Sequence, residues 1–78
     1  MDWSDPNAAR GILGANVRRL RKAKRLSQER LAELTDLDQP HISEIEAGLI
    51  NLTLDNVQAL AVALGVEPSD LLKPTVRP

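Results

Sequence analysis

The 78-residue sequence predicts one compact all-α domain made of five short helices. Apolar residues recur at helical spacing, and no segment alternates between apolar and polar residues as a strand does. Capping residues, Gly and Pro separate the helical segments at short intervals. A chain of this length buries only about 60–65% of its unfolded surface, so a large enclosed active site is not expected.

The first helix is predicted over about residues 7–24. One apolar face follows from the i, i+4, i+7 spacing of Leu13, Val17 and Leu20. A neighbouring basic stripe consists of Arg18, Lys22 and Arg25.

Two shorter helices follow, and a capping residue opens each of them. Ser27 caps a helix over about residues 28–35, because its hydroxyl can accept from a backbone N–H of the first turn. Asp38 caps the next helix, where Pro40 falls in the first turn and its missing N–H is harmless. Gly48 ends this helix. The predicted inward residues are Leu31, Ala32, Leu34, Ile42 and Ile45.

The fourth helix is predicted between a Thr53 cap and Gly65, and a short fifth helix covers Pro68–Leu72. The inward residues of the fourth helix are predicted to be Leu54, Val57, Leu60, Ala61 and Leu64. We therefore expect one domain over residues 8–72, with a flexible N-terminal tail at residues 1–7 and a flexible C-terminal tail at residues 73–78.

The composition excludes several classes of function. The chain has no cysteine, which rules out disulfides, thiol chemistry and cysteine-ligated zinc. A single His makes a protein-built metal site improbable, and no cofactor is expected. No apolar run approaches the roughly 20 residues that span a bilayer, so no membrane partner is expected. The first ten residues carry acids where a signal peptide carries bases, so we expect a cytoplasmic protein.

The charges are unevenly distributed along the chain. Residues 10–30 carry eight bases and one acid, whereas the other 57 residues carry two bases and ten acids. This asymmetry predicts a basic patch for an anionic partner. A solvated basic face beside acidic neighbours explains the same charges equally well.

The connection between the second and third helices indicates a function. About three residues, 36–38, separate these helices, so the two must cross steeply. A helix-turn-helix has this geometry. It projects its second helix outward, with the N-terminal residues free to enter a DNA major groove.

Three linked motifs, at residues 27–32, 42–48 and 60–66, resemble the Cro/CI-type helix-turn-helix family, also called the xenobiotic-response-element family. The resemblance covers about residues 12–72, and residues 51–57 look most like restriction–modification controller proteins. It implies a lambda-repressor-like five-helix domain that binds double-stranded DNA, usually as a homodimer on a pseudo-palindromic operator. The expected function is transcriptional regulation without enzymatic activity.

The resemblance and the residue chemistry together predict the contacts with DNA. Gln can bond bidentately to adenine and Glu can accept from the cytosine amino group. The predicted base contacts are Gln39, Pro40, His41, Ser43 and Glu44, although Pro40 is favoured as a helix starter. The predicted phosphate contacts are Arg21, Lys24, Gln28 and Asn51. His41 has neither a nucleophile at a recognisable spacing nor a partner histidine, so a catalytic or metal-ligand role is not expected.

The resemblance also implies an ion pair that ties the first helix to the end of the recognition helix, between Arg21 and Glu46. Two independent surface charges are the alternative. The sequence departs from the family at Asp36, where relatives usually have Gly at a position that often needs a positive φ. It departs again at residues 49–52, a loop that carries no base although relatives commonly have one there.

A homodimer is expected, with an interface that contains Leu49, Ile50, Val66 and Leu72. Leu49 and Ile50 are expected to be hard to bury within one protomer of this size. The alternative function is a small antitoxin-like or protein-interaction module, which the apolar loop and the acidic C-terminal half favour. A neighbouring methyltransferase or endonuclease gene would support a controller, and a toxin gene would support the alternative. A contact with RNA polymerase, the operator sequence and the sign of regulation stay open.

Overall fold

The structure, a computed structural model that describes residues 1–74, confirms the all-α class. Its elements are α1 (Ala8–Ala23), α2 (Gln28–Thr35), α3 (Gln39–Glu46), α4 (Leu54–Leu64) and η1 (Pro68–Leu72). The element predicted as a fifth helix is η1, a five-residue 3-10 helix, so four α-helices lie in the described part of the chain. Residues 75–78 of the predicted C-terminal tail lie outside the described residues.

The helices begin at the predicted capping residues. The Ser27 hydroxyl accepts a hydrogen bond from the N–H of Arg30, and Asp38 accepts one from the N–H of His41. Thr53 opens α4 in the same way. Each cap satisfies a backbone donor that has no partner inside its own helix. These local signals therefore place the starts of α2, α3 and α4.

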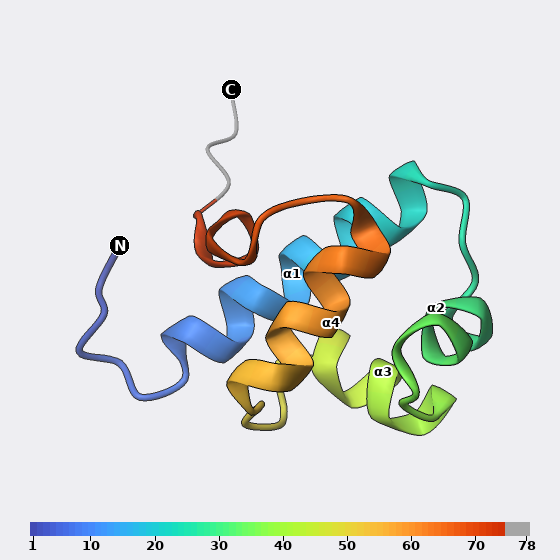
Figure 1. The fold of residues 1–78 in the computed structure, drawn as a ribbon. Coiled ribbons are helices and arrows are strands. Elements are labelled where there is room, and N and C mark those ends of the chain that lie inside the picture. The colour runs from blue at the N-terminus through green and yellow to red at the C-terminus, as the bar shows by residue number, and fades with distance from the viewer. Residues whose placement is uncertain (75–78) are drawn as a thin grey trace.

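The helix-turn-helix lies at one end of the molecule. In Figure 1, α2 and α3 are on the right, and the N-terminal tail projects from the left. The long helix α1 packs against α3, α4 and η1, whereas α2 packs against α3 and α4. The recognition helix α3 is thus held by both α1 and α2, while one side of it stays open.

One aliphatic core connects all five elements. Its most deeply buried side chains include Val17, Leu31, Ile42, Ile45, Leu60, Leu64 and Leu71. The prediction was wrong for Leu34 and Leu54, whose exposed fractions are 46% and 84%. Leu54 is the first residue of α4, at the edge of the domain, and α4 first reaches the core at Val57. In α2, Thr35 rather than Leu34 turns inward.

Two residues of α1 that the sequence analysis did not single out determine how α1 packs. Gly14 lies directly beneath the end of α3, and a Cβ there would clash with the carbonyl oxygen of Ile45. The Asn16 side chain is buried and donates to the carbonyl oxygens of Leu71 and Lys73, at 2.8 and 2.9 Å. Gly14 therefore allows α3 to approach α1 closely, and Asn16 fixes the end of η1.

Candidate nucleic-acid interface

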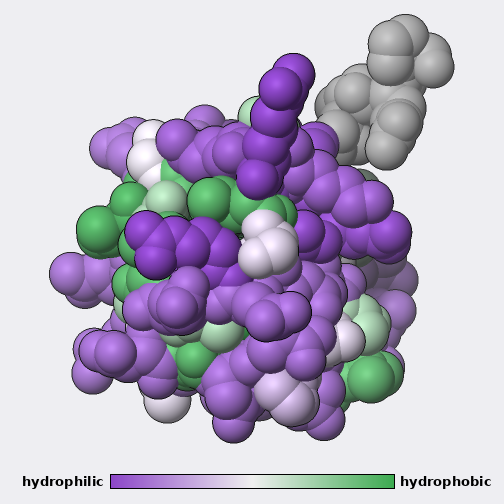
Figure 2. Space-filling view, turned by 90° about the vertical axis from the view of Figure 1, so that its right-hand side faces the viewer, coloured by the Kyte–Doolittle hydropathy of each residue, from purple (hydrophilic) through white to green (hydrophobic). Residues whose placement is uncertain are grey.

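The candidate interface is built on α3, whose inner face is fixed in the core. Ile42 and Ile45 are buried, and the predicted base-contacting residues occupy the rest of the helix surface. Of these residues, Gln39, Pro40, Ser43 and Glu44 are exposed and His41 is half-buried. Figure 2 shows the molecule from the side of α2, and this face is mostly hydrophilic. The apolar face of α3 is therefore buried in the core, and its polar face is available for contact with a partner.

The turn between α2 and α3 is made by residues 36–38. Asp36 has φ 59° and ψ 21°, which confirms the positive φ predicted for this position. The N–H of Leu37 donates to the carbonyl oxygen of Ala32 at 3.2 Å, and the Leu37 side chain packs against the core. The left-handed residue reverses the chain direction, so only three residues are needed between the end of α2 and the start of α3.

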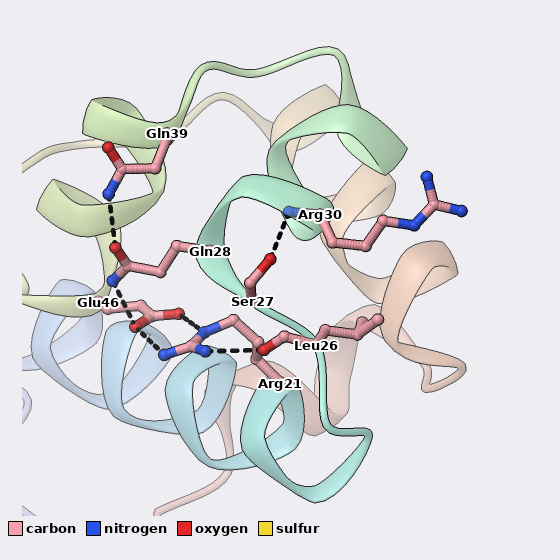
Figure 3. A network of polar contacts seen from close by, with 7 residues as sticks. All are labelled: Arg21, Leu26, Ser27, Gln28, Arg30, Gln39 and Glu46. Atoms are coloured by element: carbon pink, nitrogen blue, oxygen red, sulfur yellow. Dashed lines mark hydrogen bonds and ion pairs between the residues drawn. The ribbon is translucent and has the colours of Figure 1, made fainter.

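Arg21 and Glu46 form an ion pair between α1 and α3 (Figure 3). The Arg21 Nε donates to Glu46 Oε2 at 2.6 Å, and Nη2 donates to Oε1 at 3.0 Å. A third donor, Nη1, bonds to the carbonyl oxygen of Leu26 at 2.8 Å. The two side chains are only 11% and 5% exposed. The hydrogen bonds to Glu46 raise the pKa of the Arg21 guanidinium, so this group stays charged.

Two glutamine side chains extend this pair to the exposed start of α3. Gln28 Nε2 donates to Glu46 Oε1 at 3.1 Å, and Gln39 Nε2 donates to Gln28 Oε1 at 2.7 Å. In Figure 3 the four side chains form one continuous chain of hydrogen bonds. The outermost member, Gln39, is therefore oriented by residues on α1, α2 and α3. Gln28 and Gln39 were predicted from the sequence as two separate contacts, and the hydrogen bond between them was not predicted.

A polar cleft of about 230 Å³ opens beside the ion pair. Its lining comes from α1, α2 and α3 and consists of Arg18, Arg21, Gln28, Ser43, Glu46 and Ala47. Arg18 is exposed and was not among the predicted site residues. Its position in the basic stripe of the first helix could have identified it as a phosphate contact. Two guanidinium groups, an amide and a hydroxyl in one cleft suit a phosphate group, because Arg21 neutralises the Glu46 carboxylate in the same lining.

The other two predicted phosphate contacts lie apart from this cleft. The Lys24 ammonium lies beside Gly65, 3.4 Å from the position that a Cβ would take there. It therefore faces the C-terminal end of α4, where the helix dipole favours a cation. Asn51 is exposed in the loop after α3 and lines a second groove, together with the first turn of α1.

The four residues predicted for the dimer interface fall in different environments. Leu49 and Leu72 are 67% and 42% exposed. Ile50 and Val66 are half-buried and pack against the core, so one protomer covers Ile50 in part. Ile50 and Leu72 line one groove, whereas Val66 follows the opposite end of α4. Further exposed apolar residues are Trp3, Leu34, Leu54 and Val62.

Within residues 1–74, no group of three or more His, Asp or Glu side chains could hold a metal ion. No helix in the same range combines the length and apolar character needed to cross a bilayer.

Comparisons with known proteins agree with this geometry. A family model described as helix-turn-helix matches residues 17–71. Control protein C.BamHI of Bacillus amyloliquefaciens is 46% identical over 67 residues, which cover 85% of this chain and 83% of that protein. Control protein C.SmaI of Serratia marcescens is 41% identical over 61 residues, covering 78% of this chain and 73% of that protein.

A solved structure shows the same architecture. The restriction-modification controller protein C.AhdI from Aeromonas hydrophila superposes with a TM-score of 0.80 at 43% identity, covering 86% of this chain and 97% of that chain. With the exposed start of α3, the tight turn and the match over residues 17–71, this likeness establishes the family. The chain belongs to the helix-turn-helix family of DNA-binding transcriptional regulators, and restriction–modification controller proteins are among its relatives.

Proposed function

We propose that this protein is the controller of a restriction–modification locus and binds a pseudo-palindromic operator as a homodimer. The observation that carries the proposal is the hydrogen-bonded chain from Arg21 through Glu46 and Gln28 to Gln39. It prearranges a carboxamide at the exposed start of the recognition helix. The names of its relatives C.BamHI, C.SmaI and C.AhdI support the controller role.

Gln39 reads a base in this proposal. A carboxamide nitrogen carries two N–H donors. One donor of Gln39 bonds to Gln28, which leaves the second donor and the carbonyl oxygen for N7 and the amino group of adenine. Glu44, which is exposed one turn further along α3, accepts from a cytosine amino group. His41 and Ser43 contribute donors beside them, and Pro40 starts the helix.

The polar cleft between α1, α2 and α3 binds the DNA backbone. Gln28 and Arg18 approach a phosphate there, and the N-terminal N–H groups of α2 add a favourable dipole. The Arg21 guanidinium lies near the same phosphate and neutralises the Glu46 carboxylate, so that this carboxylate does not repel the phosphate. Asn51 and Lys24, on the loop after α3 and beyond the end of α1, take phosphates further along the duplex. Such contacts orient the protein on DNA without reading its sequence.

Two protomers are needed because one recognition helix reads only a few base pairs. A two-fold axis would place two copies of α3 in successive major grooves, roughly 34 Å apart. The half-sites are then inverted repeats, and the apolar surface around Leu49, Ile50 and Leu72 lies at the protein–protein contact. Val66 extends that contact only if the interface reaches the far end of α4.

Selection of bound duplexes from a random DNA pool tests the proposal. We expect an enriched motif with two-fold symmetry, and sedimentation of the complex should give two protomers per duplex. Insertion of five base pairs between the half-sites should abolish tight binding, because it rotates one half-site by about half a helical turn. A pool without an enriched motif would contradict DNA recognition and support the protein-interaction module instead.

A further inference from the structure

An apolar groove of about 250 Å³ lies on the side of the molecule away from α2. The start of α1, the loop before α4, the start of α4 and the end of η1 form its walls. Apolar side chains dominate the lining, among them Leu13, Ile50, Leu54 and Leu72. Arg10 is the charged residue among the described residues that line it. Leu54 and Leu72 remain 84% and 42% exposed, so the groove has an uncovered apolar rim.

The N-terminal tail carries the one aromatic residue of the chain, Trp3, which is 52% exposed. Hydrogen bonds fix the tail in a series of turns: Ser4 donates twice to the Asp2 carboxylate, and the N–H of Asn7 donates to Asp5. The hydrogen bonds from Ser4 lower the pKa of Asp2, so this carboxylate is charged near neutral pH. Trp3 is thus presented between two acidic residues on a hydrogen-bonded segment that projects from the helices (Figure 1).

We propose that the indole of Trp3 docks into this groove on a second copy of the chain, and that the exchange is reciprocal. This inference rests on the homodimer of the proposed function, and it specifies a contact between the two protomers. Charge complementarity supports it, because Asp2 and Asp5 flank the indole and Arg10 lies in the groove wall. The volume also fits, since a cavity of about 150 Å³ accepts benzene and indole is a larger aromatic ring system.

The position of the tail favours exchange between two copies. Pro6 lines the groove, so the tail that carries Trp3 and the groove itself lie in one surface patch. A two-fold interface requires this, because it uses the same patch on both protomers. Trp3 does not line its own groove, and the turns from Asp2 to Ala8 hold the tail in its present course. In the dimer each indole would cover the exposed rim formed by Leu54 and Leu72.

Fluorescence of Trp3 tests the contact directly, because it is the single tryptophan of the protein. Emission should shift to shorter wavelength as the concentration rises, in step with the dimer fraction measured by sedimentation. Leu54→Asp places a charge in the groove at an 84% exposed position, so the fold should survive and the shift should disappear. Val62→Asp is the matched control, because Val62 is 73% exposed on the same helix but lies outside the groove.

Two further variants complete the experiment. Trp3→Ala should raise the dimer Kd at least about tenfold, as the loss of a tryptophan anchor commonly does. Arg10→Glu should weaken the dimer as well, because it repels Asp2 and Asp5. Circular dichroism should report an unchanged helix content for each variant.

The outcomes separate this contact from the proposed function. A wild-type dimer whose Kd is unchanged by Trp3→Ala and Leu54→Asp would overturn the docking while the homodimer stands. Emission that is already at short wavelength in the monomer would place the indole in its own groove and would also overturn it. A wild type that stays monomeric on its operator would instead contradict the homodimer itself.

Discussion

The carboxylate of Glu46 accepts two hydrogen bonds from the guanidinium of Arg21 and so joins the last turn of α3 to α1. Glu46 also accepts a bond from Gln28, which in turn accepts one from Gln39. The residue proposed to read a base is therefore oriented by the same carboxylate that fixes α3. In the proposed function, stability and DNA recognition are therefore coupled through this one group.

Replacement of Arg21 by Ala should destabilise the fold. It removes the charged partner of the Glu46 carboxylate, whose side chain is only 5% exposed in the intact pair. We expect the free energy of unfolding to fall by roughly 2–3 kcal/mol, somewhat less than the 3–5 kcal/mol lost when a fully buried pair is broken. Urea denaturation measures the change. Arg18→Ala is the control, since Arg18 is exposed on the same helix and should change stability by less than about 0.5 kcal/mol.

Replacement of Gln39 by Ala should weaken the best DNA site by about 1–3 kcal/mol and relax the preference at one base pair. The reason is the loss of a prearranged carboxamide from the start of α3. Binding titrations against the best site and its single-base variants measure both effects. An equal loss of affinity on specific and random DNA would refute base reading by Gln39.

Two glycines of α1 should respond in opposite ways to Ala. A Cβ at Gly14 would clash with the carbonyl oxygen of Ile45, so Gly14→Ala should push α3 away from α1 and destabilise the fold. Gly11 has open space around it, so Gly11→Ala should stabilise the helix by about 0.5–1 kcal/mol. Thermal unfolding of the two variants compares them. If Gly14→Ala is as stable as Gly11→Ala, the close approach of the helices is wrong.

Asp36→Gly should stabilise the fold, because Asp36 has φ 59° and a residue with a Cβ is strained there. The gain should be roughly 0.5–1 kcal/mol, since relief of the strain of about 1–2 kcal/mol is partly offset by the greater chain entropy of Gly. Asp36→Val should destabilise the fold, as β-branched residues tolerate this region least. Chemical denaturation that ranks Val above Gly at this position would contradict the assigned turn.

Local signals in the sequence were sufficient to predict the helix starts. The Ser27, Asp38 and Thr53 caps depend on residues within three positions in the chain, so short-range patterns identify them. The positive φ of Asp36 was predicted because relatives in the family usually have Gly at this position. The Arg21 and Glu46 pair came from the resemblance alone, because 25 residues separate the two along the chain.

Features that depend on tertiary packing were not predictable in this way. Helical periodicity placed Leu54 inward, but the position of α4 at the edge of the domain leaves it 84% exposed. No local pattern marks Asn16, because the two carbonyl oxygens that it bonds belong to the end of η1, more than fifty residues away along the chain. The bond between Gln28 and Gln39 likewise depends on the crossing of α2 and α3.

The central claim is that α3 reads the base sequence of DNA. The most direct measurement is a titration of the wild-type protein against two labelled duplexes at one salt concentration, its selected site and a scrambled duplex of the same composition. We predict that the selected site binds at least about 1,000-fold more tightly, as is usual for specific recognition. Equal affinity for the two duplexes would contradict the claim.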